Sequence, residues 1–442
     1  MPRFKLSKEK KILLIFVGAA LLGFFIRTGF AKHFIKESGD IRLYADWAEK
    51  IWAFGARTFY IYPQWYYAPP NYPPLLSLIY AGAYWLWDHK YALAQLHNLI
   101  KIPPAIFIIY FYEHGLFFLL KLPGILADLA LGFLAFELTR KITGNIKRAF
   151  AAGVFYLFNP VSIFLSGVWG QTDSLVSLFG LLSFVTLWAG KAWLSLPFLL
   201  LSFYIKPNWG IFIPLYLFLL ILKKPKIKQV LLGLLLSFVL FWATTQPFVK
   251  EGNVFSFSRW LWRERLLPTA TVAQKASVSA FNLHTILLTM DKSADSTPYL
   301  GIPAKYVGYI AFLLINIITF GYIKRQKLSL SSVLVGIFSI GFGSYLFLTN
   351  MLERYFFQSF VPMIVLMFSS PSLLIYGILL NIAVFVNVFY AFLRRSRGWL
   401  ADAFGANNFA LVRLFSTVNL VSWALFVKNI YKSRFIDNKL SK

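Results

Sequence analysis

Runs of about 20 apolar residues recur along this whole chain, and each is long enough for a helix to cross the roughly 30 Å hydrocarbon core of a bilayer. Hydrophobic residues make up 58% of the 442 positions and charged residues only 14%, whereas a soluble domain carries roughly 25% charged residues. No polar stretch is long enough for a separate soluble domain. The pattern predicts an all-α, polytopic integral membrane protein with a single membrane domain over residues 1–442.

The net charge of +27 does not indicate nucleic-acid binding, because the lysines and arginines lie in short clusters between the apolar runs. Such clusters set membrane topology and contact anionic headgroups, so membrane lipids and no nucleic acid are the expected partners. The lack of cysteine excludes disulfides and thiolate metal sites, and five scattered histidines do not indicate a zinc site. The first apolar run is too long for a cleaved signal peptide and is expected to act as a signal anchor.

Basic clusters predict which loops are cytoplasmic, by the positive-inside rule. Both termini are expected inside, with 1–10 as a basic N-terminal segment and 428–442 as a basic tail. Residues 31–116 and 248–301 are expected to form two large external loops. Fitting apolar runs between these segments gives about twelve transmembrane helices, and up to about fourteen. The predicted spans are 11–30, 117–138, 149–166, 174–190, 192–205, 207–222, 228–247, 302–323, 330–349, 356–370, 372–392 and 409–427.

Two features do not fit this scheme. The short apolar pieces 72–87 and 102–112 are either a hairpin of short spans or helices that lie in the membrane interface. Arg394, Arg395 and Arg397 fall on the external side. Either the scheme is off by one span there, or these arginines serve a site.

The first external loop carries a predicted amphipathic helix. Asp40, Tyr44, Trp47 and Ile51 recur at helical spacing and so share one face, while Glu49 lies on the other. We expect this helix to lie flat at the membrane interface with Asp40 at its N-terminus. Asp is also a favoured helix cap, so capping explains Asp40 equally well.

Other unusual residues also fall on the predicted external side, and each has an ordinary explanation. Double prolines around Tyr72 suit a rigid helix start, Asp173 could cap a helix, and a lone Lys206 could snorkel. Glu353 and Arg354 could form a surface pair of no consequence. Lys121 and Asp128 lie in or near a span, where ionisable groups are functional candidates. Together, two carboxylates, a lysine and an arginine on one face suit a substrate with a phosphate and a transferable polar group.

The order of motifs resembles that of the GT-C glycosyltransferases, which use polyprenyl-phosphate sugars, and most closely the prokaryotic mannosyltransferases related to GPI mannosyltransferase II. The resemblance covers residues 39 to 355. The matching pieces, in family order, are Gly39-Asp40, Tyr44, Trp47-Ala48, Tyr72-Pro73-Pro74, Lys121-Leu122-Pro123, Ala127-Asp128, Asn159-Pro160, Trp169-Gly170-Gln171-Thr172-Asp173, Lys206-Pro207 and Glu353-Arg354-Tyr355. Two departures are Leu352, where relatives often carry a histidine, and Gly39, where some branches carry a second acid.

The resemblance implies transfer of a sugar, with mannose expected, from polyprenyl phosphate to a hydroxyl of a lipid or glycan acceptor, with inversion. It implies that Asp40 is the catalytic base and that Gln171 and Asp173 line its cavity. We expect Lys206, Arg354 and Lys121 to bind the donor phosphate, with Arg259, Arg263 and Arg265 in reserve. Sugar or acceptor contacts are expected from Tyr44, Tyr72, Trp169, Gln171, Asp173, Glu353 and Tyr355.

The same interpretation predicts no metal and no cofactor beyond the lipid-linked sugar, with a divalent metal ion as the open alternative. The composition favours a prokaryotic plasma membrane, with the site facing the exterior or periplasm. An alternative is a transporter or flippase for a phosphate-bearing lipid or glycan, although no internal repeat typical of transporters is visible. A purely structural membrane subunit would leave the acids, lysine and arginine unexplained.

Overall fold

A computed structural model describes residues 7–271, 273–299 and 301–432. The described chain is helical apart from one small antiparallel hairpin, β1 (Pro298–Tyr299) and β2 (Ile302–Pro303). The first eight α-helices are α1 (Lys8–Phe30), α2 (Gly39–Phe54), α3 (Ala56–Phe59), α4 (Pro74–Asp88), α5 (Lys90–Ile100), α6 (Ala105–Thr143), α7 (Ile146–Leu157) and α8 (Pro160–Ile163). Parts of the predicted basic termini, residues 1–6 and 433–442, lie outside the described residues.

The later helices continue the bundle. They are α9 (Asp173–Trp188), α10 (Ala192–Ile205), α11 (Ile213–Lys223), α12 (Ile227–Thr245), α13 (Val254–Leu261), α14 (Leu267–Thr271), α15 (Leu283–Leu287), α16 (Ala304–Arg325), α17 (Leu330–Phe347), α18 (Phe360–Ser369), α19 (Leu374–Leu393) and α20 (Gly398–Lys432). Short π or 3-10 turns join some of them: η1 (Phe164–Trp169), η2 (Pro207–Phe212), η3 (Gln246–Phe248), η4 (Trp262–Leu266), η5 (Tyr355–Ser359) and η6 (Pro371–Leu373).

Within the described residues, eight helices are long and apolar enough to cross a membrane. They are 8–30, 105–143, 146–169, 227–248, 304–325, 330–347, 371–393 and 409–432. Four shorter apolar helices, 173–188, 192–205, 207–223 and 355–369, fall at other predicted spans. The fold is therefore that of an all-α membrane protein, as predicted, while the count of twelve crossings stays a prediction.

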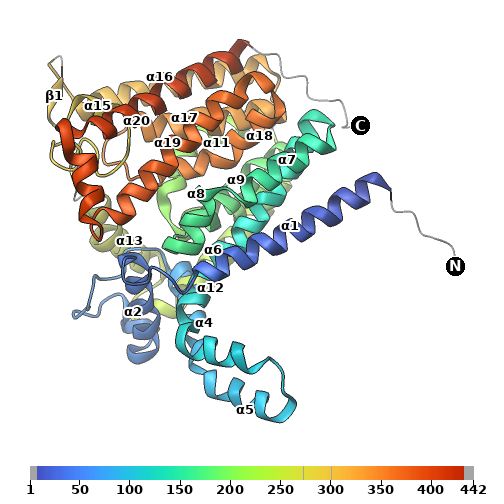
Figure 1. Cartoon of the computed structure of the whole chain (residues 1–442), viewed down its shortest axis with the longest axis vertical. Coiled ribbons are helices and arrows are strands. Elements are labelled where there is room, and N and C mark those ends of the chain that lie inside the picture. Colours follow the sequence, from blue (N-terminus) through green and yellow to red (C-terminus); the bar gives the residue numbers. More distant parts are fainter. Residues whose placement is uncertain (1–6, 272, 300, 433–442) are drawn as a thin grey trace.

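The helix α6 differs from the sequence prediction in length. Its 39 residues, at 1.5 Å each, extend about 58 Å, so the apolar piece 102–112 largely belongs to the same helix as the predicted span 117–138. The piece 72–87 forms α4, and α5 follows it. In Figure 1, α5 lies in a part of the chain that projects from the bundle, where it packs against α6. The predicted first external loop, 31–116, thus ends inside a helix that begins at Ala105.

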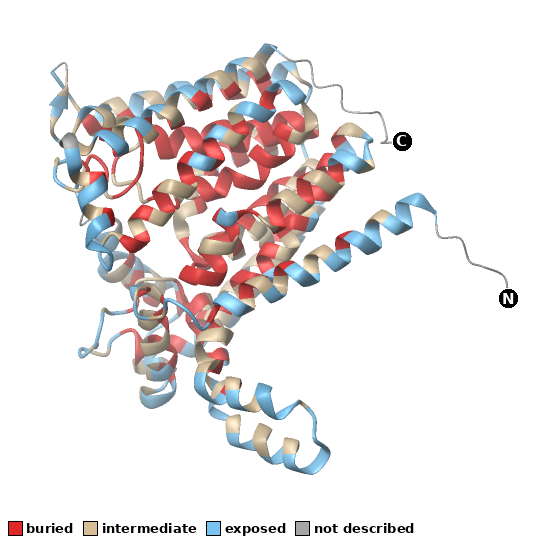
Figure 2. Cartoon of the chain, viewed as in Figure 1, coloured by how far each residue is buried: buried red, intermediate tan, exposed pale blue. Residues whose placement is uncertain are grey.

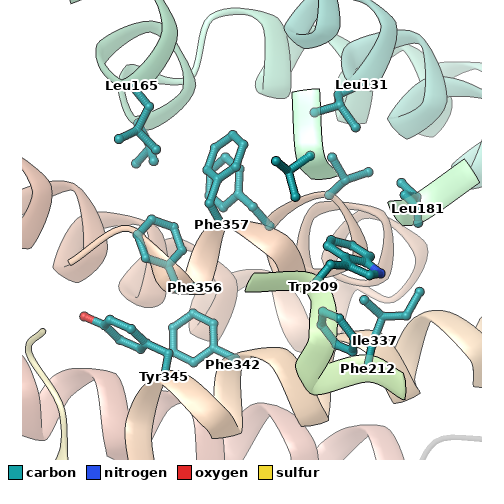
Figure 3. Packing of buried hydrophobic residues seen from close by; sticks show 14 of the residues in the cluster. Leu131, Leu165, Leu181, Trp209, Phe212, Ile337, Phe342, Tyr345, Phe356 and Phe357 are labelled. Carbon is teal, nitrogen blue, oxygen red and sulfur yellow. The ribbon is translucent and has the colours of Figure 1, made fainter. Parts of the chain in front are cut away.

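The centre of the bundle is α17, whose residues are almost all buried (Figure 2). Aromatic rings pack against it from η2 and η5, including Phe212, Phe356 and Phe357 (Figure 3). Glycine allows the closest approach: a Cβ on Gly341 would stand 2.7 Å from a ring carbon of Phe212. Small residues at such crossings let membrane helices pack tightly.

A buried ion pair joins α1 to α6. Arg27 Nε lies 3.1 Å from Asp128 Oδ2, and both side chains are fully buried. The hydroxyl of Tyr156 donates to Asp128 Oδ1 at 2.7 Å. Arg27 also donates to Ser162 Oγ and to the carbonyl oxygens of Gly23 and Leu157. Asp128, a functional candidate from the sequence, is thus fully bonded within the helix packing.

Candidate functional site

The helix α2 presents Asp40 to the ends of the other helices. Ser38, rather than Asp40, is the N-cap: its Oγ accepts from Ile41 N at 3.3 Å and donates to the carbonyl of Trp169 at 2.8 Å. The predicted amphipathic face is confirmed, since Tyr44 and Trp47 are completely buried. Because Ser38 caps the helix, the Asp40 carboxylate is free for other contacts.

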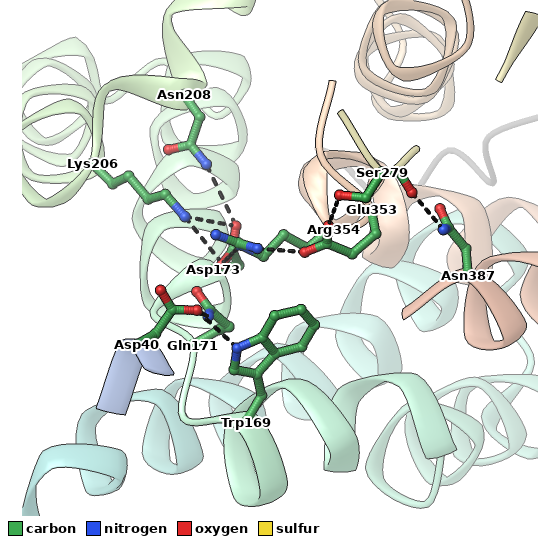
Figure 4. Close-up of polar contacts among 10 residues, drawn as sticks. All are labelled: Asp40, Trp169, Gln171, Asp173, Lys206, Asn208, Ser279, Glu353, Arg354 and Asn387. Carbon is green, nitrogen blue, oxygen red and sulfur yellow. Dashed lines mark hydrogen bonds and ion pairs between the residues drawn. The ribbon is translucent and has the colours of Figure 1, made fainter. Parts of the chain in front are cut away.

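Two side chains from one motif hold Asp40. Trp169 Nε1 donates to Asp40 Oδ2 at 2.8 Å, and Gln171 Nε2 donates to the same oxygen at 2.6 Å (Figure 4). None of the described residues hydrogen-bonds to Asp40 Oδ1. Gly170 between them has a φ of +80°, and a Cβ there would stand 2.9 Å from Ile41 Cδ1, so glycine is required. The predicted grouping of Asp40, Trp169 and Gln171 is therefore present in the structure.

A second cluster centres on Asp173. Lys206 Nζ lies 3.3 Å from Asp173 Oδ2, Asn208 Nδ2 lies 3.4 Å from Oδ1, and Arg354 Nε lies 3.9 Å from Oδ2. Burial would lower the pKa of Lys206, but the nearby Asp173 carboxylate more than offsets this, so that the pKa is raised and Lys206 stays charged. Thr172, and not Asp173, occupies the N-cap of α9.

Glu353 and Arg354 link the two clusters. They are 2% and 8% exposed and pair with each other, so the surface-pair interpretation is wrong. Arg354 Cζ also lies 5.2 Å from the ring centre of Trp169. Burial opposes the charge on Arg354, but Glu353, Asp40 and Asp173 outweigh it and raise the pKa well above the usual value.

Glu353 is held from a distant part of the chain. Ser279 Oγ donates to Glu353 Oε2 at 2.6 Å, and Asn387 Nδ2 donates to the carbonyl of Ser279 at 2.7 Å (Figure 4). Sequence reasoning missed both Ser279 and Asn387. Asn387 is a buried polar residue inside the apolar helix α19, and that could have been a signal.

Aromatic rings surround the clusters. The rings of Tyr44 and Tyr80 stack at 4.7 Å, and the ring of Tyr72 lies 6.2 Å from that of Tyr44. Lys206 Nζ lies 5.8 Å from the ring centre of Tyr72 and 5.9 Å from that of Tyr355. Burial, with Tyr72, Tyr80 and Asp40 nearby, raises the pKa of Tyr44 well above its usual value, so its hydroxyl stays protonated.

Two cavities meet at Asp40 and Arg354. The loop cavity, of about 980 Å³, is lined mainly by connecting segments and helix ends, including Glu37, Tyr66, Lys275, Asp291 and Arg395. The helix cavity, of about 960 Å³, is lined by Tyr72, Lys206, Asn208, Trp262, Lys305 and Tyr309 among others. Asp40, Leu43, Leu352 and Arg354 line both cavities. The carboxylate of Asp40 and the guanidinium of Arg354 thus lie at the boundary between the loop cavity and the helix cavity.

Some predicted residues lie elsewhere. Lys121 lines neither of these cavities. Its Nζ donates to the carbonyl oxygens of Gly167 and Val168, the two residues before Trp169, at 3.1 and 2.8 Å. Of the three reserve arginines, Arg265 donates to the carbonyl of Tyr60 at 2.9 Å, and none of the three lines these cavities. The other predicted site residues belong to the two clusters or to the rings around them.

Among the described residues, no group of three or more His, Cys, Asp or Glu side chains could hold a metal ion. Comparisons of the chain with protein-family models and with curated proteins found no match. The likeness to the GT-C glycosyltransferases therefore rests on the motifs quoted above. The geometry itself offers a half-bonded carboxylate beside two buried cations, an arrangement suited to taking a proton next to a bound anion.

Proposed function

We propose that the protein is an inverting glycosyltransferase that moves a sugar, expected to be mannose, from polyprenyl phosphate to an acceptor hydroxyl on the external face of a membrane. The observation that carries this proposal is the position of Asp40. Its Oδ2 is fixed by Trp169 and Gln171, its Oδ1 has no partner among the described residues, and both cavities reach it.

Asp40 acts as the general base in this mechanism. The acceptor oxygen attacks the anomeric carbon while Asp40 takes the hydroxyl proton and the bond from that carbon to the phosphate oxygen breaks. The electron pair leaves with polyprenyl phosphate, and attack from the opposite face inverts the configuration. The transition state resembles an oxocarbenium ion, as in glycoside hydrolysis. A positioned base of this kind contributes roughly 10²–10⁴-fold in rate.

Lys206 and Arg354 hold the donor phosphate and offset the charge that grows on it as the bond breaks. Asp173 supports this role because it fixes both cations before the substrate binds, at 3.3 and 3.9 Å. Cations that are already positioned need little reorganisation in the transition state. The apolar walls of the helix cavity, such as Trp262 and Tyr309, suit the first isoprene units.

The donor sugar sits between the two clusters. Gln171 Oε1, Asn208 Oδ1 and Gln358 Oε1 are buried and have no hydrogen-bond partner among the described residues. A buried oxygen without a partner costs about 1–3 kcal/mol, and sugar hydroxyls would satisfy it. Tyr72 and Tyr355 supply ring faces beside Lys206 for the same purpose.

The test is transfer of labelled mannose from a polyprenyl-phosphate donor by protein purified in detergent. Asp40→Asn should lower turnover by roughly 10²–10⁴-fold. Glu49→Gln, an exposed change on the same helix, is the matched control and should retain full turnover. Unchanged turnover in Asp40→Asn would remove Asp40 from the mechanism.

Detergent also separates this proposal from the transporter alternative. Vectorial transport cannot occur without a sealed bilayer, so sugar transfer in detergent identifies an enzyme. No transfer in detergent, together with movement of a phosphate-bearing lipid across reconstituted vesicles, would instead favour the flippase.

A further inference from the structure

We infer that the loop cavity binds the acceptor and that the acceptor is a neutral carbohydrate, an assignment that rests on the proposed glycosyl transfer. The two cavities share Asp40 but divide the other groups between them. Lys206 lines only the helix cavity, so the donor phosphate belongs there. A hydroxyl held in the loop cavity therefore reaches Asp40 from a volume that Lys206 does not line.

The two cavities differ in the charged residues that line them. Among the described residues, four carboxylates and four cations line the loop cavity: Glu37, Asp40, Asp291, Glu353, Lys275, Arg354, Arg394 and Arg395. Two carboxylates and three cations of the described chain line the helix cavity: Asp40, Asp295, Lys206, Lys305 and Arg354. In the helix cavity, Lys206 and Arg354 are both positioned by the buried Asp173 and can bind an anion together, whereas a ligand in the loop cavity meets equal numbers of carboxylates and cations. The loop cavity thus selects an uncharged ligand rather than a phosphate or a charged peptide.

Two of the carboxylates that line the loop cavity, Asp291 and Glu37, are held by arginines. Arg394 Nη1 donates to Asp291 Oδ2 at 2.5 Å, and Arg397 Nη2 lies 3.8 Å from Glu37 Oε1. These contacts join the segment after α19 to the segments before α2 and after α15. Arg394 and Arg395, two of the three arginines that broke the positive-inside pattern, therefore form part of the wall of the loop cavity. Paired carboxylates and guanidinium groups offer acceptors and donors side by side, which matches the dual character of a sugar hydroxyl.

Exposed aromatic rings supply the second half of a carbohydrate site. Tyr66 is 82% exposed and Tyr67 is 44% exposed, and both line the loop cavity. The apolar face of a pyranose ring packs on such rings. Arg42 Cζ lies 5.5 Å from the ring centre of Tyr67, so a guanidinium donor lies beside this ring.

The experiment measures Michaelis constants for donor and acceptor separately, with neutral disaccharides such as mannobiose as acceptor probes. Tyr66→Ala and Arg395→Ala should each raise the acceptor KM about three- to tenfold and leave the donor KM unchanged. Lys305→Ala, in the helix cavity, should instead raise the donor KM and leave the acceptor KM unchanged. All three side chains lie at the surface or part-buried, and thermal unfolding checks that each variant folds.

Parallel assays use a serine-containing peptide and an anionic phospholipid as acceptors. Transfer to either of these, with none to neutral disaccharides, overturns the inference. An unchanged acceptor KM in both Tyr66→Ala and Arg395→Ala overturns it as well. Hydrolysis of the donor by water, measured without any acceptor, distinguishes a failure of this inference from a failure of the proposed function. If donor hydrolysis occurs but no disaccharide is glycosylated, only this inference fails, whereas neither hydrolysis nor transfer rejects the proposed function.

Discussion

Two sets of buried charges differ in how completely the protein satisfies them. The pair Arg27–Asp128 is fully buried, and neighbours within the packed helices donate to or accept from both partners. The cluster around Asp40, Asp173 and Arg354 is also largely buried, yet several of its polar atoms have no partner among the described residues. In the sequence, Asp128 and Asp173 look alike, because each is a single carboxylate beside an apolar run.

The difference teaches that burial of a charge is not by itself a sign of function. An ionisable residue in a membrane helix is a functional candidate, but a pair whose bonds are all made inside the protein has nothing left for a substrate. The site cluster retains buried amide oxygens, on Gln171, Asn208 and Gln358, that have no partner among the described residues. Predictions that separate stability from substrate binding test this distinction.

The largest expected effect is on stability. Asp128→Ala leaves the Arg27 guanidinium buried without its carboxylate, which should lower the free energy of unfolding by about 3–5 kcal/mol. The measurement is unfolding in detergent at increasing denaturant. The folded fraction should keep its donor KM, because neither Arg27 nor Asp128 lines the two cavities at Asp40.

A double variant is the matched control. Arg27→Met with Asp128→Leu removes both charges and should recover most of the lost stability, since apolar replacements of a buried pair are often neutral or better. If Asp128→Ala changes donor KM but not stability, the contrast between the two sets of charges is lost.

Two buried lysines give the next comparison. Lys206→Ala removes a cation from the helix cavity and should raise the donor KM roughly 10- to 100-fold, as expected for a hydrogen bond to a charged group. Lys121→Met removes the contacts to Gly167 and Val168, and it should lower thermal stability while donor KM stays within about threefold. Equal effects on donor KM would mean that Lys121 also reaches the phosphate.

Helical spacing was enough to predict the face of α2 that carries Asp40, Tyr44 and Trp47, because a regular local period does not depend on the rest of the fold. It could not separate Lys121 from Lys206. Each is a lone lysine near an apolar run, and only long-range packing decides that one meets backbone carbonyls and the other meets Asp173.

The hydrogen bonds that hold Glu353 in place could not be predicted from the sequence either. Ser279, Glu353 and Asn387 come from segments far apart in the chain, and no local pattern brings them together. The continuity of α6 was missed for a different reason. Residues 113 and 114 are polar and interrupt the hydropathy, but they remain compatible with one long helix.

The smallest expected effect concerns the segment that carries Ser279 and Asp291, which His284 helps to anchor. The ring of His284 is buried, with Nε2 2.8 Å from the carbonyl oxygen of Phe347 and Nδ1 2.5 Å from the hydroxyl of Tyr299. Burial lowers the pKa of His284, and the bond to Phe347 offsets this only in part. The ring is therefore neutral in the folded protein at neutral pH.

Because the folded state binds the proton of His284 less tightly than the unfolded state, stability should fall as pH falls below about 6.5. Each unit by which the pKa is lowered is worth about 1.4 kcal/mol, and the loss is complete once pH is below the folded pKa. Melting temperatures of the parent and of His284→Gln between pH 7.5 and 5 measure it. The parent should lose more stability than His284→Gln across that range, and parallel curves would mean that His284 does not carry the effect. If acceptor KM rises with the same pH dependence, while donor KM does not, then the loop cavity depends on this anchor and the helix cavity does not.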